Sequence, residues 1–188
     1  MSEELIPLIV DEQGVASGVR FIASPNFDER PPDAKVSLLV LHNISLPPGI
    51  FGGGAIIDLF TNALDYGAHP YYDGLRGQRV SAHFLIRRDG ELIQFVACAR
   101  RAWHAGSSRW RGRPRCNDYS VGVELEGSDS AAYESPQYLQ LARLTRALRA
   151  RYTLPDTAGH ADVAPGRKSD PGPSFDWARY RAELAGLR

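Results

Sequence analysis

The chain has 188 residues, which is typical of one domain, and 43% of them are hydrophobic, as expected for a protein with a buried core. Lys plus Arg and Asp plus Glu number 22 each, so the formal net charge is zero. General binders of nucleic acids or anionic membranes usually carry excess positive charge, so this balance argues against both kinds of partner. No apolar run approaches the roughly 20 residues that a membrane-spanning helix needs.

The N-terminal sequence and the cysteines indicate a cytoplasmic protein. The opening MSEELIPLIVDEQG is acidic and lacks the basic and apolar regions of a secretory signal. Cys98 and Cys116 form no CxxC pair and no dense disulfide pattern. We expect a cytoplasmic monomer in which residues 1–23 form an arm packed on one domain of residues 24–188.

The first half of the chain predicts strands and one helix. We expect a short strand at Gly18–Ala23. Val36–Leu41 is a continuous apolar run, typical of a strand buried on both faces of a sheet. Ala55–Leu64 places apolar side chains at helical spacing. Ser81–Arg87 and Glu91–Val96 flank an Asp-Gly pair, which predicts a β-hairpin.

The next segments predict an irregular region, a strand and a long helix. Arg100–Arg115 holds six arginines and has no clear periodicity. Tyr119–Gly127 alternates between apolar side chains and glycine or glutamate, as a strand does. Gln137–Tyr152 has an apolar helical face, with Ser135 as a plausible N-cap residue.

The C-terminal region predicts a loop followed by a closing helix. Ala158–Pro173 is rich in Gly, Pro and Asp and reads as a loop. Phe175–Leu184 is the closing helix, which Ser174 could cap. Together these elements predict a single α/β domain with a central mixed β-sheet flanked by helices.

Two histidines and one aspartate have settings that suit a metal site. His42 ends a buried strand, where functional side chains converge. His160 lies in a loop, and Asp170 follows ten residues later in a stretch stiffened by proline. Two imidazoles and a carboxylate suit Zn²⁺ with one open position. Spacing alone nevertheless favours the simpler interpretation, a solvated loop with an isolated histidine and aspartate.

Six segments, nearly spanning the chain, resemble one enzyme family. In order they are LHNISLPPG, AHPY, SAHFLIRRDGE, RAWHAG, CNDYSVGVELEG and GRKSDPGPSFDWARY. They resemble the type 2 N-acetylmuramoyl-L-alanine amidases, in particular the cytoplasmic members that act on 1,6-anhydro-muropeptides during cell-wall recycling. The resemblance implies hydrolysis of the amide between the lactyl group of (1,6-anhydro)-N-acetylmuramic acid and L-alanine.

The resemblance also assigns roles to individual residues. It implies one Zn²⁺ per chain, held by His42, His160 and Asp170. Glu124 would be the general base and acid, and Lys168 would stabilise the oxyanion. Contacts with the muropeptide are implied at Asn43, Tyr71, Arg79, Trp103 and Arg115.

Several alternatives remain open from the sequence. Glu124 shares a strand face with Glu126, so the alternation alone cannot choose between them. His104 could line the substrate cleft or be structural. The arginine-rich segment could be a solvated surface or a cationic rim for substrates with several carboxylates. The chain could also be a non-catalytic peptidoglycan-binding protein, or a zinc peptidase or deacylase acting on other amides.

Overall fold

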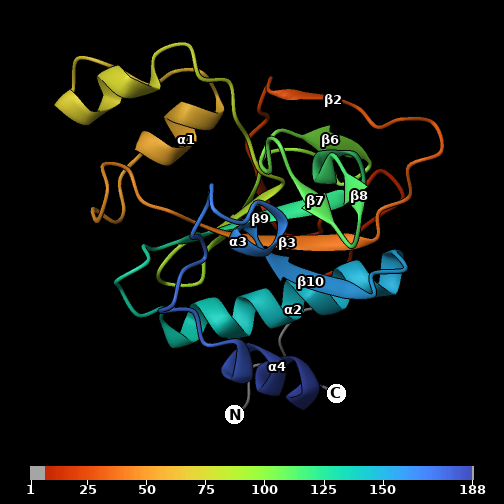
Figure 1. Cartoon of the computed structure of the whole chain (residues 1–188). Coiled ribbons are helices and arrows are strands. Elements are labelled where there is room, and N and C mark those ends of the chain that lie inside the picture. The colour runs from red at the N-terminus through yellow and green to blue at the C-terminus, as the bar shows by residue number, and fades with distance from the viewer. Residues whose placement is uncertain (1–6, 188) are drawn as a thin grey trace.

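Six strands form one mixed β-sheet at the centre of the computed structural model, which describes residues 7–187 (Figure 1). Their order across the sheet is β1-β5-β4-β9-β3-β10. Two further pairs, β2 with β6 and β7 with β8, lie outside it. The strands are β1 (Arg20–Phe21), β2 (Phe27–Glu29), β3 (Leu38–Ile44), β4 (Phe84–Ile86), β5 (Leu92–Gln94), β6 (Arg100–Ala102), β7 (Arg109–Trp110), β8 (Arg113–Pro114), β9 (Ser120–Glu126) and β10 (Asp156–Gly159).

The centre of the sheet is parallel. β3 pairs in parallel with both β9 and β10, and β9 pairs in parallel with β4. β4 and β5 form the predicted antiparallel hairpin, and β1 lies parallel to β5. The predicted mixed sheet is therefore confirmed. The strand predicted at Val36–Leu41 is shifted, because β3 runs on to Ile44 and so contains His42 and Asn43.

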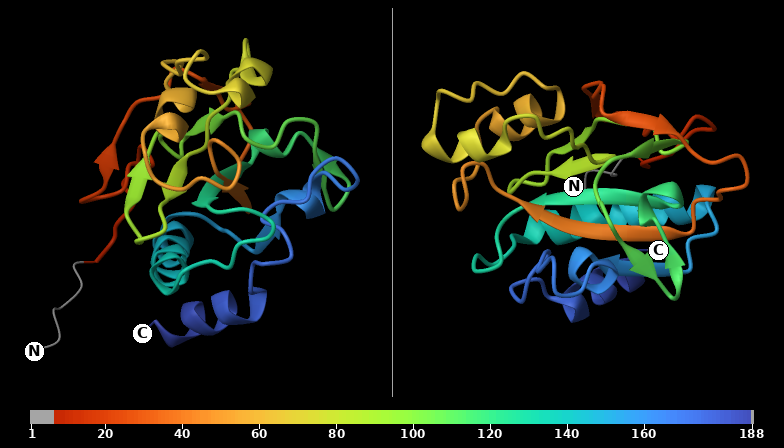
Figure 2. Two further views of the ribbon diagram at one scale, coloured as in Figure 1. Left: turned by 90° about the vertical axis from the view of Figure 1, so that its left-hand side faces the viewer. Right: turned by 45° about the horizontal axis from the view of Figure 1, so that its top comes forward.

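Helices cover both faces of the sheet (Figure 2). On one face, α2 (Ser135–Arg151) packs on the sheet and α4 (Trp177–Gly186) packs on α2 (Figure 1). On the other face lie α1 (Ala55–Phe60) and the 3-10 helix η1 (Pro70–Leu75). Each face thus has its own apolar core, and the sheet separates them.

The two long helices begin differently from the prediction. Glu134, not Ser135, is the N-cap of α2, and its backbone N–H donates to the side-chain oxygen of Gln137. The N-cap of α4 is Asp176, whose carboxylate accepts from the backbone N–H of Arg179. Ser174 instead donates to the carbonyl oxygen of Asp129, so its hydroxyl is not available for capping.

Short elements account for the other differences. The predicted helix Ala55–Leu64 ends at Phe60, and Asn62 adopts a left-handed backbone with φ 62°. The expected loop 158–173 contains the end of β10 and the four-residue helix α3 (His160–Val163), and the segment 116–118 is a 3-10 helix, η2 (Cys116–Asp118). Elements of two to four residues show no periodicity, so the sequence pattern could not reveal them.

The described part of the N-terminal arm is tied to the sheet. β1 adds an edge strand, and Val10 and Ala16 form an isolated bridge and are both buried. Residues 1–6 of the expected arm lie outside the described residues, and the boundary at residue 23 stays a prediction. Within residues 7–187, no helix is both long and apolar enough to cross a membrane.

Truncating Leu141 should destabilise the fold strongly. This α2 side chain is fully buried in the core between sheet and helices. We expect Leu141→Ala to lower the free energy of unfolding by about 2–5 kcal/mol, because the substitution leaves a cavity. Urea unfolding measures the change. The control is Leu139→Ala on the same helix, where the side chain is 37% exposed and the loss should stay below about 1 kcal/mol. Equal losses would contradict the assigned core.

Candidate metal centre and substrate pocket

The parallel strands bring the candidate residues together at the carboxyl edge of the sheet. β3 and β9 pair in a register that sets His42 opposite Glu124. β3 and β10 pair Leu41 with Gly159, so His160 begins where β10 ends. Directly paired residues point to the same face of a sheet. Ligands of open α/β sheets commonly bind at this edge.

Three potential metal-binding atoms meet there. His42 Nδ1 lies 2.9 Å from His160 Nδ1, and each of these nitrogens lies 3.0 Å from Asp170 Oδ2. Among the described residues, these three form the one group of His, Cys, Asp or Glu side chains placed to hold a metal ion. The two histidines are buried and Asp170 is partly buried. The structure thus joins residues that lie up to 128 positions apart in the chain.

The loop that carries Asp170 is held by its neighbours. The backbone N–H of Ala161 donates to the carbonyl oxygen of Asp170 at 2.9 Å. The next carbonyl, that of Pro171, accepts from the hydroxyl of Tyr133 at 2.7 Å and from the side chain of Asn43 at 3.1 Å. These bonds hold the backbone at Asp170 and Pro171 and so help to place the Asp170 side chain beside the two histidines.

The electrostatics favour metal binding. Burial lowers the pKa of His42 to about 4, with partial compensation from the adjacent carboxylate of Asp170, so the ring is neutral at pH 7. Burial alone would raise the pKa of Asp170, but its close contacts with His160 and His42 outweigh burial and hold that pKa below its usual range. Neutral imidazole and ionised carboxylate are the forms that ligate metals.

The donor set fits Zn²⁺. Three lone-pair atoms about 3 Å apart repel one another unless a proton or a cation lies among them. Two histidines and a carboxylate form a common three-ligand set for catalytic zinc, which keeps a further position open. His42, His160 and Asp170 could therefore hold this ion.

Glu124 lies beside this cluster with an unused oxygen. Its side chain is buried, and Oε2 has no hydrogen-bond partner among the described residues. Burial raises the pKa of Glu124 well above its usual range, the charge of Asp170 adds to this effect, and Lys168 opposes it. A buried carboxyl with an elevated pKa can carry a proton, which is what a general acid or base does.

Glu126, unlike Glu124, has hydrogen-bond and ion-pair partners for its carboxylate. Its carboxylate accepts from the backbone N–H groups of Gly52 and Arg88 and pairs with the side chain of Arg87. These contacts tie the glycine-rich loop after β3 to the β4–β5 hairpin. The two glutamates of β9, which the alternation could not distinguish, thus differ in their partners: Glu126 is engaged and Glu124 faces the cluster.

A cavity of about 210 Å³ surrounds the cluster. Of the predicted muropeptide contacts, Asn43 and Trp103 line it, whereas the exposed residues Tyr71, Arg79 and Arg115 are not part of its lining. The complete lining is His42, Asn43, Ile44, Phe60, Gln78, Val80, Ser81, Trp103, His104, Glu124, His160, Lys168 and Asp170. A larger cavity of about 590 Å³ holds none of these residues.

The sequence did not predict Gln78 or Ser81 as lining residues. Both lie between η1 and β4; Gln78 falls outside the six segments, and Ser81 opens the segment SAHFLIRRDGE, in which no role was assigned to it. Lys168 is exposed at the cavity, and its backbone N–H donates to the carbonyl oxygen of Ala164.

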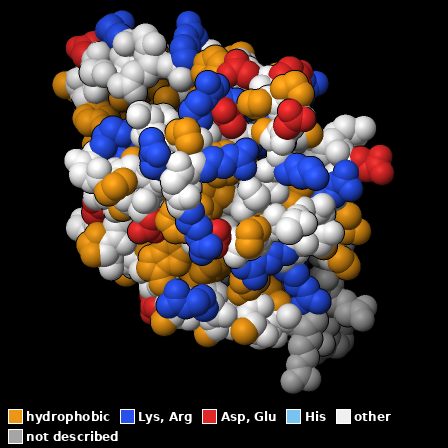
Figure 3. Space-filling view, turned by 45° about the vertical axis from the view of Figure 1, so that its right-hand side comes forward, with side chains coloured by type: hydrophobic (Ala, Val, Ile, Leu, Met, Phe, Trp, Pro, Cys, Tyr) orange, Lys and Arg blue, Asp and Glu red, His pale blue; other side chains and the backbone are white. Residues whose placement is uncertain are grey.

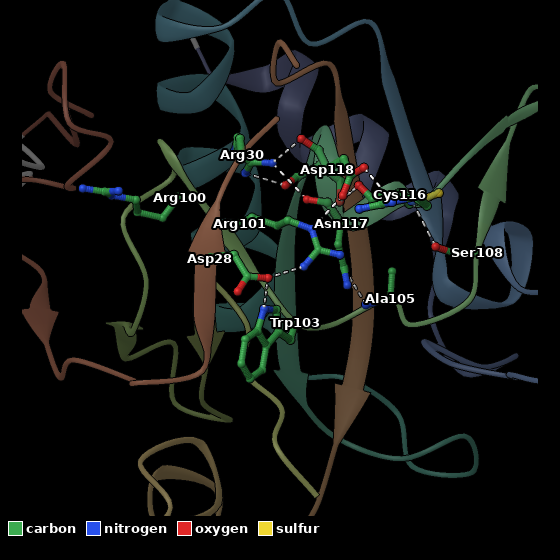
Figure 4. A network of polar contacts seen from close by, with 12 residues as sticks. Asp28, Arg30, Arg100, Arg101, Trp103, Ala105, Ser108, Cys116, Asn117 and Asp118 are labelled. Carbon is green, nitrogen blue, oxygen red and sulfur yellow. Dashed lines mark hydrogen bonds and ion pairs between the residues drawn. The ribbon is translucent and has the colours of Figure 1, made fainter. Parts of the chain in front are cut away.

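Trp103 and His104 form one wall of the cavity, and a polar network anchors these residues and the adjoining Ala105 (Figure 4). The indole N–H of Trp103 donates to the carboxylate of Asp28, which also pairs with Arg101. The side-chain oxygen of Asn117 accepts from the backbone N–H of Ala105 at 2.8 Å. Strand β2 and helix η2 thereby position this wall.

The arginine-rich segment is partly neutralised. Arg101 and Arg115 pair with Asp118, and Arg111 pairs with Asp156. Figure 3 shows Lys and Arg side chains dispersed over this side of the molecule, among hydrophobic and other side chains. The cationic rim for acidic substrates stays a prediction.

Comparison with known families decides the class of the protein. Residues 32–173 match the N-acetylmuramoyl-L-alanine amidase family, and this range includes the whole cluster and Glu124. The chain belongs to the N-acetylmuramoyl-L-alanine amidase family.

Similar proteins place the chain near one group of these amidases. It is 57% identical to the 1,6-anhydro-N-acetylmuramyl-L-alanine amidase AmpD of Escherichia coli K12, over 90% of this chain and 94% of that one. The protein of the same name from Citrobacter freundii is 56% identical, over 93% and 94%. A crystal structure of a selenomethionine AmpD derivative matches with a TM-score of 0.91 and 55% identity, covering 94% of this chain and 99% of that one.

Removing one ligand should abolish metal binding by this amidase. Purified protein loaded with zinc and dialysed should hold about one ion per chain by elemental analysis. Asp170→Ala should fall to near zero, because two imidazoles alone bind far more weakly. Asp156→Ala is the matched control, since its carboxylate is similarly shielded but lies outside the cluster. Full occupancy in Asp170→Ala would rule out this metal site.

Proposed function

We propose that the chain is a zinc-dependent hydrolase of the amide between the lactyl group of 1,6-anhydro-N-acetylmuramic acid and L-alanine in recycled muropeptides. The observation that carries this proposal is the group of two imidazoles and a carboxylate beside the buried carboxyl of Glu124, whose Oε2 has no hydrogen-bond partner among the described residues. Names of similar proteins support the choice of bond. One similar protein is AmpD of Escherichia coli. Another is the amidase AmiD, whose structure was solved with the substrate anhydro-N-acetylmuramic acid-L-Ala-D-γ-Glu-L-Lys. AmiD is 27% identical with a TM-score of 0.58, and the match covers 94% of this chain and 65% of that one.

The metal would supply the activation that an amide requires. His42, His160 and Asp170 are the proposed ligands. When bound, Zn²⁺ acts as a Lewis acid toward the carbonyl and lowers the pKa of a water molecule toward about 7. The protein must provide the remaining requirements, which are proton transfer, charge stabilisation and placement of the substrate.

Glu124 is the proposed proton carrier. The attacking water must lose a proton, and the leaving amine must gain one before the C–N bond breaks. Oε2 of Glu124 has a lone pair that no described group uses, and its carboxyl lies in the cavity. A raised pKa makes the protonated form accessible after the first transfer, so one carboxyl can serve both steps.

Lys168 and the cavity walls complete the proposed mechanism. The ammonium group of Lys168 would stabilise the negative charge that develops on the carbonyl oxygen. Trp103 and Asn43 line the cavity and would contact the muropeptide. Since both amide hydrogens of Asn43 are directed at Asp129 and Pro171, Asn43 would offer its carbonyl oxygen.

The outer contacts and the cellular setting are also part of the proposal. Tyr71, Arg79 and Arg115 would meet the peptide or sugar beyond the inner cavity. We propose one Zn²⁺ per chain, a monomer, a cytoplasmic location, and no nucleic-acid or membrane partner. The neutral net charge agrees with the last point.

Glu124→Gln should remove most turnover while leaving zinc bound. The amide cannot accept the proton from water, so we expect kcat to fall by about 10²–10⁴-fold. Zinc content by elemental analysis should equal that of the unmodified protein, because Glu124 is not a proposed ligand.

Glu126→Gln is the matched comparison on the same strand. It should lower thermal stability through its contacts with Gly52 and Arg87, and kcat should stay within about fivefold. If Glu124→Gln keeps near-normal turnover, the role given to Glu124 is wrong.

A substrate panel tests the bond that is cut. The protein should release free peptide from an anhydro-muropeptide, as read by mass spectrometry, and chelation followed by zinc should abolish and restore this release. Plain peptides of the same sequence should be cut far more slowly. Comparable rates would favour a zinc peptidase or deacylase, and binding without release would favour a non-catalytic peptidoglycan-binding protein.

A further inference from the structure

His104 lies directly behind the metal cluster and contacts one of its members. His104 Nδ1 is 2.9 Å from Nε2 of His42, the ring nitrogen that faces away from the cluster. On its other side, His104 Nε2 is 3.1 Å from the hydroxyl of Ser120. That hydroxyl lies 2.6 Å from the carbonyl oxygen of Cys116. The four groups form one continuous hydrogen-bonded chain.

The carbonyl at the end of this chain fixes the direction of every bond. A carbonyl oxygen can only accept, so the one hydroxyl hydrogen of Ser120 must point to Cys116. The Ser120 oxygen is then left to accept from His104 Nε2–H. A neutral His104 with its hydrogen on Nε2 has a bare Nδ1, which accepts from His42 Nε2–H. His42 therefore presents its Nδ1 lone pair to the cluster.

Ala105, the residue after His104, orients the second imidazole, that of His160, in the same way. His160 Nε2 lies 3.2 Å from the carbonyl oxygen of Ala105, which again can only accept. This bond places the hydrogen of His160 on Nε2 and leaves Nδ1 bare. The consecutive residues His104 and Ala105 thus orient both imidazoles.

The backbone is shaped to hold His104 in this position. The imidazole of His104 lies against Gly122 of β9, where an added Cβ would come within 2.4 Å of the ring. The side-chain oxygen of Asn117 accepts from the backbone N–H of His104 at 3.3 Å and of Ala105 at 2.8 Å. The ring is therefore confined between strand and loop.

We propose that His104 is a positioning residue for the metal site, which holds His42 in the orientation and tautomer that ligate through Nδ1. This inference rests on the proposed function, since it requires that His42 binds zinc. His104 itself has its Nδ1 directed at His42 and does not point a free nitrogen into the cluster.

Two substitutions of His104 separate this role from simple packing. In Asn, the amide oxygen lies the same number of bonds from Cα as Nδ1 of His, so His104→Asn keeps an acceptor for His42. His104→Leu fills similar space without an acceptor. Zinc dissociation constants, measured by competition with a chromophoric chelator, should rise about 10–100-fold for His104→Leu and about threefold or less for His104→Asn.

Ser120→Ala tests the chain one step further from the metal. It removes the acceptor of His104 Nε2–H and should weaken zinc binding several-fold. Thr145→Val is the matched control on α2, because Thr145 is also buried and its hydroxyl also donates to a backbone carbonyl, that of Leu141. Both variants should lower the melting temperature of the metal-free protein, but Thr145→Val should leave the zinc dissociation constant unchanged.

The outcomes distinguish failure of the proposed zinc site from failure of the positioning role of His104. Unmodified protein that binds no zinc would overturn the proposed function itself. Unmodified protein that binds zinc, with His104→Leu and Ser120→Ala within twofold of it, would overturn the positioning role alone. Equal weakening in His104→Asn and His104→Leu would also overturn it, because packing rather than the acceptor would then matter. Circular dichroism of each metal-free variant verifies folding.

Discussion

The parallel pairing of β3 with its two neighbours is the constraint on which the site depends. The register sets His42 beside Glu124 on one side and, on the other, ends β10 one residue before His160. A shift of one residue would turn each side chain to the opposite face of the sheet. β3 buries apolar side chains on both of its faces and β9 buries them on one, so such a shift would be costly. The core therefore specifies the geometry of the polar site.

The sequence could predict the parts of the fold that have strong periodic or turn patterns. The apolar run of β3, the alternation of β9, the Asp-Gly hairpin and the apolar face of α2 all led to correct elements. Motif resemblance supplied His42, His160 and Asp170, and the structure brings these three together. Spacing alone had favoured an isolated histidine and aspartate, since it cannot show that β10 pairs with β3 and so brings His160 close to His42.

The remaining features depend on tertiary contacts. The N-caps of α2 and α4 are Glu134 and Asp176, where Ser135 and Ser174 had been expected. The hydroxyl of Ser174 donates to Asp129, which is distant in sequence, so the sequence pattern could not show that this hydroxyl is engaged. Glu124 and Glu126 share a face, and only their neighbours in space distinguish them. The sequence neighbours of His104 could not show whether it lines the cleft or is structural, because the groups that contact it lie in β3, β9 and η2.

The chain of groups behind His42 terminates at a main-chain carbonyl, and this has a consequence for proton traffic. A peptide oxygen has no hydrogen to give and no readily accessible protonated form, so the route through Ser120 is a blind end. It can orient a ring, but it cannot deliver protons from solvent or carry them away. In the proposed mechanism, the protons exchanged during each turnover would therefore move on the open side of the cavity, between the substrate, water and Glu124.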